Sequence, residues 1–478
     1  MLFNSFQFFL FLPIVFVLYW FVFSKNKSTQ NVFLLIASYV FYSFWDWRFS
    51  FLLAFSTILD FSTGLIIEKA DSHLKKRRWM RFSILTNLGL LAYFKYTNFF
   101  IDSFIDLFNV IGIHSDPYTL NIILPVGISF YTFHGVSYVL DIYFGRIKPH
   151  QNIVDYSLFV SYFPLLVSGP IERATHLLPQ IKEKREFGYV QGVEGLKLII
   201  WGLFKKIVIA DSLAPVVNEI FQNYQNHSSI TLIIGVIGFA FQVYGDFSGY
   251  TDIARGVSKL LGIELILNFN FPYFSKSIPE FWSKWHISLS SWLNDYVFTP
   301  LALRFRNWGR QGVFMAVTLT FLISGFWHGA AWHFVIWGAL HAIYYIPSIY
   351  SKKGLKSMVK KKVELISFTD LPKIIITFSF VCFGYVFFRA DSLLIAFNYI
   401  EIIIIDFISN PAQLFLLPMG VKIVYFSAIF LILELLIFNY KLFSKKVFWL
   451  SLLLIEIQFC YDLFYSVDIP NTFIYFQF

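Results

Sequence analysis

Residues 229–249 read SITLIIGVIGFAFQVYGDFSG, a stretch with no basic residue and a single acid, Asp246, near its end. An α-helix crosses the hydrocarbon core of a bilayer with about 20 mostly apolar residues. The stretch therefore predicts a membrane-spanning helix. A charged side chain inside such a helix costs a few kcal/mol, so Asp246 is also a first candidate for a functional residue.

The rest of the chain has the same apolar character. Of its 478 residues, 57% are hydrophobic and only 14% are charged. Soluble domains carry about 25% charged residues, so this chain has too little polar surface to fold as an ordinary soluble protein. Its high hydrophobicity equally excludes a disordered chain. We therefore predict an all-α polytopic membrane protein that forms a single domain over residues 1–478.

About 11–12 segments of the chain are long and apolar enough to span a bilayer. They lie near residues 6–23, 31–45, 49–67, 82–100, 122–144, 199–217, 229–249, 312–327, 331–350, 371–388, 421–439 and 448–466. No basic region precedes the first segment and no small-residue cleavage site follows it, so we expect a retained span rather than a signal peptide. Residues 396–478 are expected to hold the C-terminal spans.

Basic residues indicate how the spans are oriented. They outnumber the acids by 38 to 29, which gives a net charge of +9, and they cluster in loops that follow odd-numbered spans. These clustered residues are Lys25, Lys27, Lys75, Lys76, Arg77, Arg78, Arg81, Arg146, Lys148, Lys352, Lys353, Lys356, Lys360, Lys361, Lys362, Lys441, Lys445 and Lys446. Cytoplasmic loops carry an excess of Lys and Arg, so we expect these loops in the cytoplasm and both termini outside. The charge is thus a topology signal, and no nucleic-acid partner is expected.

Two stretches do not fit simple spans. Residues 154–170 end in Ser-Gly-Pro with basic residues on both sides, and residues 251–300 mix Trp, His, Ser, Pro and charged residues. Polar or irregular backbone persists at membrane depth only where protein or water surrounds it. We expect re-entrant or interfacial helices there, lining an interior space. The two cysteines, Cys382 and Cys460, lie in apolar runs without metal-ligand spacing and are expected to be buried.

Ionisable residues inside apolar segments are the candidates for function. They are His134, Asp141, Asp246, Asp252, His286, His328, His333 and His341. An intramembrane histidine more often makes a helix-packing hydrogen bond than catalyses a reaction. Asp246 and Asp252 are likewise more readily interpreted as partners of Arg255 or as helix caps. A metal site at His328 and His333 is disfavoured, because a spacing of five is not the i, i+4 pair of a zinc helix.

His328 has the surroundings that best suit chemistry. Four small neighbours are expected to open space beside its ring, and two tryptophans are expected to wall that space. These neighbours are Ser324, Gly325, Gly329 and Ala330, and the tryptophans are Trp327 and Trp332. An imidazole, with an unperturbed pKa near 6.5, could act there as a general base. His286 lies on a different element and could converge on the same cavity.

Nine short motifs follow one another along residues 90–395. They are Phe-Lys-Tyr at 94–96, Leu-Pro-Val-Gly-Ile-Ser-Phe-Tyr-Thr-Phe at 124–133, Ser-Tyr-Val-Leu-Asp at 137–141, Ser-Gly-Pro-Ile-Glu-Arg at 168–173, Gly-Leu-Phe-Lys-Lys at 202–206, Asp-Phe-Ser-Gly-Tyr-Thr-Asp-Ile-Ala at 246–254, Phe-Trp-Ser-Lys-Trp-His-Ile-Ser-Leu-Ser-Ser-Trp-Leu at 281–293, Ser-Gly-Phe-Trp-His-Gly-Ala-Ala-Trp at 324–332 and Gly-Tyr-Val-Phe-Phe-Arg-Ala at 384–390. In this order they resemble the motifs of the membrane-bound O-acyltransferases, in particular the bacterial branch that O-acetylates alginate.

The resemblance implies a fold and a set of site residues. The fold would be a ring of spanning helices around a thinned centre, with re-entrant helices and a funnel or tunnel between the two faces. His328, in the Trp-His-Gly motif, would be the catalytic residue, and His286 would be a second active-site or tunnel residue. The substrate- or tunnel-lining candidates are Asp246, Asp252, Trp285, Ser288, Ser290, Asp295, Ser324 and Trp327. No tightly bound cofactor or metal is expected.

The resemblance also implies an O-acyltransferase in the cytoplasmic membrane of a bacterium. The donor would be an acyl thioester, acetyl-CoA or an acyl carrier protein, presented from the cytoplasm. The acceptor would be the hydroxyls of an extracytoplasmic polysaccharide or cell-envelope glycan. Expected partners are membrane lipids and an extracytoplasmic acetyltransferase of the SGNH type. Three alternatives stay open: D-alanyl transfer to teichoic acid, a transporter or flippase of the acyl group or glycan, and an assembly scaffold without chemistry.

Overall fold

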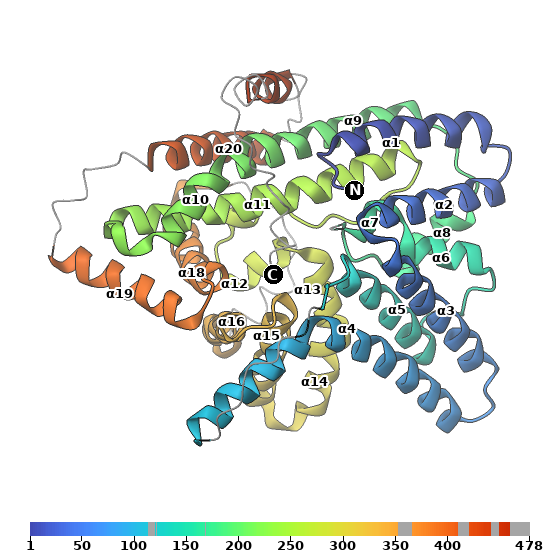
Figure 1. Ribbon diagram of the computed structural model, residues 1–478, viewed down its shortest axis with the longest axis horizontal. Coiled ribbons are helices and arrows are strands. Elements are labelled where there is room, and N and C mark those ends of the chain that lie inside the picture. Colours follow the sequence, from blue (N-terminus) through green and yellow to red (C-terminus); the bar gives the residue numbers. More distant parts are fainter. Residues whose placement is uncertain are drawn as a thin grey trace. The chain divides into compact units, whose positions relative to one another are not determined.

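A computed structural model describes residues 1–112, 120, 122–167, 169–351, 366–409, 420–440 and 449–458 of the chain. Within these ranges the regular structure is helical and contains no β-strand (Figure 1). Five of the described helices are long and apolar enough to cross a membrane. They are Arg48–Lys69, Ser229–Leu260, Arg306–His328, Phe368–Arg389 and Gly420–Phe438. The prediction of an all-α, multi-pass membrane protein is confirmed.

The helices fall into two compact units, one of residues 1–199 with 251–266 and the other of residues 200–250 with 267–478. The first unit holds α1 (Phe6–Val17), the π-helical η1 (Leu18–Val22), α2 (Lys27–Asp46), α3 (Arg48–Lys69), α4 (His73–Val110), α5 (Ile128–Tyr143), α6 (Ile153–Ser161), α7 (Phe163–Leu166) and α8 (Ala174–Lys182). Two helices, α9 (Tyr189–Leu203) and α11 (Ser229–Leu260), run from one unit into the other. The prediction of a single domain stays a prediction.

The second unit holds the motifs with histidines. Its elements are the π-helical η2 (Phe204–Asp211), α10 (Ser212–Gln222), α12 (Ile278–Lys284), α13 (Ile287–Leu293), the π-helical η5 (Asn294–Phe298), α14 (Thr299–Arg304), α15 (Gly309–His328), α16 (Trp332–Tyr350), α18 (Leu371–Arg389), α19 (Leu393–Ser409) and α20 (Gly420–Tyr440). Figure 1 shows α15 and α16 side by side, and the two helices pack against each other.

Most apolar segments fold as helices near the predicted positions, with two informative differences. The segment 122–144 becomes helical only at Ile128, because Gly127 has a φ of +75°. A Cβ at Gly127 would lie 2.1 Å from the carbonyl oxygen of Leu166, so no other residue fits there. The segment 199–217 is not one regular span, since the π-helix Phe204–Asp211 interrupts it.

The two irregular stretches contain short helices, as predicted. Residues 154–170 hold α6 and the four-residue α7, and residues 251–300 hold α12 and α13, each of seven residues. Ser277 caps α12, because its side chain accepts a hydrogen bond from the amide of Glu280. Whether these helices are re-entrant stays a prediction.

Several predictions fall on residues outside the described ranges. These are the buried Cys460, the basic loops at 352–362 and 441–446, Ser168 of the Ser-Gly-Pro motif and the end of the segment 448–466. Cys382 is buried in α18 as a free thiol, as expected.

Candidate active site

His328 is positioned by the crossing of α15 and α16. At this crossing a Cβ on Gly325 would lie 2.3 Å from the carbonyl oxygen of Phe334, and one on Gly338 would lie 2.3 Å from that of Phe321. Small residues let two membrane helices bring their backbones together in this way. His328 is the last residue of α15, and the chain leaves the helix at the extended Gly329. The ring of His328 is thereby held at the helix end, where 5% of the residue is exposed.

Aromatic rings surround the His328 imidazole. Its centroid lies 4.9 Å from that of Trp327, 5.0 Å from that of Trp337 and 5.2 Å from that of Phe388, all in edge-to-face geometry. These rings come from α15, α16 and α18, so three helices meet at this histidine. The imidazole is therefore packed mainly against aromatic rings.

The expectation that small residues open space beside His328 is wrong for the two glycines. A Cβ on Gly329 would lie 1.9 Å from the ring of Phe334, and the space at Gly325 is filled by the backbone of α16. The glycines therefore serve close packing. Trp332 does not form a buried wall either, because 56% of it is exposed, whereas Trp327 is buried.

His286 lies between α12 and α13 and is fully buried. Its φ is +44°, in the left-handed region that a non-glycine residue rarely adopts. Two backbone hydrogen bonds hold the chain on either side of it. The amide of Ile287 donates to the carbonyl oxygen of Asn268 over 2.9 Å, and that of Asn270 donates to the carbonyl oxygen of Lys284 over 3.0 Å. The strained conformation is thus imposed by the surrounding chain.

The His286 side chain contacts Asn268, Ser288 and several rings. Its Nδ1 lies 3.2 Å from Oδ1 of Asn268 and 3.5 Å from Oγ of Ser288, and its ring lies edge-on to Phe247 at 4.7 Å. Burial lowers the pKa of His286 well below its usual range, so the ring is neutral. Sequence reasoning missed Asn268. The available signal was a polar residue within the irregular segment 251–300.

Trp327 brings the two histidines into one neighbourhood. Its indole centroid lies 6.2 Å from that of His286 and 4.9 Å from that of His328. Trp285 packs edge-on against Phe269 at 5.0 Å. The structure therefore brings together two separated motifs, residues 281–293 with Trp285 and His286 and residues 324–332 with Trp327 and His328.

Two of the predicted serines have internal partners. Ser288 Oγ donates to Oδ1 of Asn268 over 2.9 Å, and Ser290 Oγ donates to the carbonyl oxygen of Trp285 over 3.1 Å. These two hydroxyls hold the α12–α13 turn together, whereas Ser324 is buried within α15. That the serines line a tunnel stays a prediction.

The three acidic candidates have different locations. Asp246 forms an ion pair with the buried Lys206 at 2.7 Å, and Lys206 also contacts Asp211 at 2.8 Å. Asp252 belongs to the other unit, where it pairs with Arg255 at 3.1 Å as expected. Arg255 is thus the partner of Asp252, while Asp246 uses Lys206. Asp295 is exposed on η5.

The other histidines make packing hydrogen bonds. His134 Nε2 accepts from the amide of Glu172 at 3.0 Å, His333 Nδ1 donates to the carbonyl oxygen of Phe387 at 2.9 Å, and His341 Nδ1 accepts from Trp282 Nε1 at 3.2 Å. No group of three or more His, Cys, Asp or Glu residues in the described ranges could hold a metal ion.

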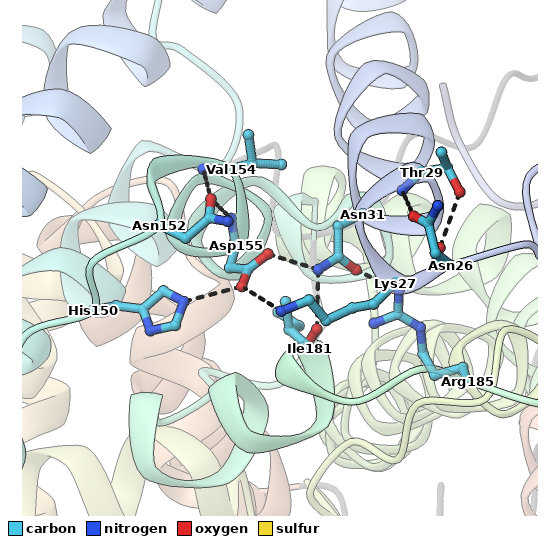
Figure 2. A network of polar contacts seen from close by, with 10 residues as sticks. All are labelled: Asn26, Lys27, Thr29, Asn31, His150, Asn152, Val154, Asp155, Ile181 and Arg185. Atoms are coloured by element: carbon cyan, nitrogen blue, oxygen red, sulfur yellow. Dashed lines mark hydrogen bonds and ion pairs between the residues drawn. The ribbon is translucent and has the colours of Figure 1, made fainter.

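The first unit contains a polar cluster of its own, centred on Asp155 (Figure 2). This nearly buried carboxylate accepts a hydrogen bond from Asn31 Nδ2 at 2.7 Å and lies 3.1 Å from His150 Nε2. Lys27 Nζ lies 3.6 Å away, and Arg185 donates to Oδ1 of Asn31. The cluster ties α2 to α6 and to the segment after α8.

Comparison with known proteins identifies the family of this chain. A model of the family described as MBOAT, membrane-bound O-acyltransferase, matches residues 5–387. The chain belongs to this family. The membrane-bound O-acyltransferase described here is therefore an enzyme that transfers acyl groups to oxygen.

Three relatives of this O-acyltransferase are named for different acceptors. The probable alginate O-acetylase of Pseudomonas aeruginosa is 37% identical over 84% of this chain and 74% of its own length. The peptidoglycan O-acetyltransferase of Helicobacter pylori is 36% identical over 82% of this chain and 78% of its own length. The teichoic acid D-alanyltransferase of Bacillus subtilis is 31% identical over 58% of this chain and 70% of its own length.

Proposed function

We propose that this O-acyltransferase moves an acetyl group from a cytoplasmic thioester toward hydroxyls of an extracytoplasmic polysaccharide or cell-envelope glycan. The arrangement that carries the proposal is the pair of buried histidines, His286 and His328, whose rings both contact Trp327. The relatives named for O-acetylation match a larger share of the chain than the one named for D-alanyl transfer. This difference favours an acetyl group over a D-alanyl group.

His328 is the general base in the proposed reaction. It takes the proton from the acceptor hydroxyl, or from a nucleophile of a partner protein, and the oxygen attacks the thioester carbonyl carbon. A C–O bond forms, the C–S bond breaks, and the proton passes from the imidazole to the departing thiolate. Proton transfer by a positioned base contributes about 10²–10⁴ in rate.

The rings around His328 favour transfer over hydrolysis. The ring centroids of Trp337 and Phe388 lie 5.0 Å and 5.2 Å from that of the imidazole, so its surroundings are apolar. Excluding water protects a thioester from hydrolysis and strengthens electrostatic interactions within the site. In this proposal His286, neutral and fully buried, orients the substrate.

The donor, partners and location complete the proposal. Acetyl-CoA is the favoured donor and an acyl carrier protein the alternative. An extracytoplasmic acetyltransferase of the SGNH type would complete transfer to the glycan. The enzyme would lie in the bacterial cytoplasmic membrane, with the thioester arriving at the face that carries the basic loops.

The test is O-acetylation of envelope glycans in cells that carry His328→Ala. We expect acetylation to fall by at least about 100-fold, because the base is removed. The matched control is His134→Gln, which replaces a buried histidine of the first unit whose Nε2 accepts a hydrogen bond from the amide of Glu172. Undiminished acetylation by His328→Ala, at normal protein abundance, would contradict the proposed role.

Transport of the acyl group or glycan is the competing function. A buried ion pair also suits secondary transport. Here Lys206, in the π-helix that interrupts the segment 199–217, pairs with Asp246 of α11. Purified enzyme in detergent separates the two, because no gradient exists there. Release of free thiol from acetyl-CoA that depends on an acceptor and on His328 would reject pure transport.

A further inference from the structure

One amide oxygen organises the turn that carries His286. Oδ1 of Asn268 lies 3.2 Å from His286 Nδ1, 3.2 Å from the amide nitrogen of Ser288 and 2.9 Å from Ser288 Oγ. Asn268 is 1% exposed, so these contacts do not compete with water. One oxygen thus contacts both the His286 ring and the backbone and hydroxyl of Ser288.

The contacts determine which way the amide points. The backbone N–H of Ser288 can only donate, so the Asn268 atom that faces it must be the oxygen. The same oxygen can only accept from the ring of His286. His286 Nδ1 must therefore carry the hydrogen, and a neutral ring then has its lone pair on Nε2.

We propose that Asn268 is a positioning residue, which holds His286 in the Nδ1–H tautomer and thereby leaves Nε2 as the hydrogen-bond acceptor of the site. The role rests on the proposed acyl transfer, in which a proton must move between oxygen, nitrogen and sulfur. A histidine held in the other tautomer would present a donor where an acceptor is needed. Asn268 acts through His286 and does not itself touch the reacting atoms.

Two further features separate this role from simple packing. His286 adopts the left-handed conformation at φ +44°, and strained residues persist where the surrounding structure fixes a functional geometry. Within the described part of the chain, Nδ2 of Asn268 has no hydrogen-bond partner although it is buried. A buried amide group without a partner costs free energy, so this arrangement is not the one that stability alone favours.

The tautomer can be observed directly. Nitrogen-15 NMR of the full-length protein, labelled at histidine and reconstituted in bilayers, distinguishes a protonated ring nitrogen from an unprotonated one. The His286→Gln variant assigns the signal. We expect Nδ1 protonated and Nε2 unprotonated in the wild type, and a mixture of tautomers in Asn268→Leu. A wild-type ring protonated at Nε2 overturns the proposal, whatever the enzyme transfers.

The pH dependence of activity gives a second readout. Asn268→Asp keeps an acceptor at the same place but adds a negative charge, which favours the imidazolium and raises the pKa of His286. The neutral ring then exists only at higher pH, so the acidic limb of the rate profile shifts upward by about one pH unit or more. Asn268→Leu should lower kcat by at least about 10-fold with little change in KM, because the wrong tautomer is populated.

Ser291→Ala is the matched control. It removes a hydrogen bond of the same short helix, from Ser291 Oγ to the carbonyl oxygen of Ser288 over 2.9 Å, but leaves the contact between Asn268 and His286. We expect its rate profile to keep the wild-type pH dependence. Equal losses of kcat in Ser291→Ala and Asn268→Leu, with no pH shift in Asn268→Asp, would assign Asn268 a structural role only. Absence of acyl transfer in the wild type would instead reject the proposed function and leave the NMR result standing.

Discussion

His286 combines complete burial with a left-handed backbone at one position. For a residue with a Cβ the left-handed conformation costs roughly 1–2 kcal/mol. The hydrogen bonds of Ile287 to Asn268 and of Asn270 to Lys284 fix the chain in this conformation. The imidazole is therefore held in place by its backbone as well as by its Nδ1 contact, and the two effects can be separated by mutation.

Replacing His286 by glycine or by alanine separates them. Both variants lose the imidazole, and we expect both to lose acyl transfer. Glycine adopts φ +44° without the steric cost that alanine pays, so His286→Gly should unfold at a higher temperature than His286→Ala, by the equivalent of about 1 kcal/mol. Thermal unfolding of the two purified variants in the same detergent measures this difference. An equal or lower Tm for the glycine variant would mean that the turn relaxes after mutation.

The histidines could be predicted from the sequence, but their partners could not. Ionisable residues in apolar segments are costly, which singled out His286 and His328, and the motifs gave them roles. Asn268 is uncharged and lies 18 residues before its partner His286. The residues around Asn268 in the sequence give no sign that its side chain contacts a histidine 18 residues later. The lysine partner of Asp246 was missed for the same reason, because Lys206 lies on another helix.

At the scale of elements, the close crossing of α15 and α16 sets the place of His328. Adding a methyl group at Gly325 must displace the backbone of α16, since its Cβ would lie 2.3 Å from the carbonyl oxygen of Phe334. We expect Gly325→Ala to destabilise the protein by about 1–3 kcal/mol and to lower activity as His328 shifts. Thermal unfolding and the acetylation assay measure the two effects.

Gly89 supplies the control for that prediction. It lies inside α4, and a Cβ there would meet nothing within 4 Å. Gly89→Ala should therefore be neutral or stabilise the protein by up to about 1 kcal/mol, because alanine is the better helix former. A similar loss of stability in both variants would show that the tight crossing is not the cause.

The Asp155 cluster of Figure 2 makes the stability of the first unit depend on pH. Burial lowers the pKa of His150, against the opposing effect of Asp155. The unfolded chain then binds a proton at this histidine more readily than the folded protein. Stability is present above the unfolded pKa near 6.5 and falls as the pH drops through the folded value. We expect the Tm to decrease between about pH 7 and 5, and His150→Gln to flatten this part of the curve.

A helix could be predicted where a long apolar segment forms it. An irregular element that forms through tertiary contacts could not be predicted. The runs at 49–67 and 371–388 became α3 and α18 because a long apolar segment has few alternatives to a helix. Within the interruption at Phe204–Asp211, Lys206 pairs at 2.8 Å with Asp211, which lies five residues on, the spacing of a π-helical turn. Hydropathy does not record such a contact.

At the scale of the whole molecule, charge distribution predicts the topology that the proposed function requires. A cytoplasmic thioester and an extracytoplasmic acceptor need faces of defined orientation, and the clusters of Lys and Arg provide the signal. One cluster lies in the first turns of α4, whereas residues 218–228 contain no Lys or Arg. The start of α4 and residues 218–228 should therefore face opposite sides of the membrane.

Cysteine labelling in intact cells tests this topology. In a background with Cys382 and Cys460 changed to serine, we expect a membrane-impermeant maleimide to label Asn226→Cys from outside, since the loop is free of basic residues. Arg77→Cys, in the basic cluster, should react only after lysis. Both native side chains are exposed, so access through the protein does not limit either reaction. Labelling of Arg77→Cys from outside would invert the predicted orientation, and the thioester would then have to reach the histidines from the opposite face.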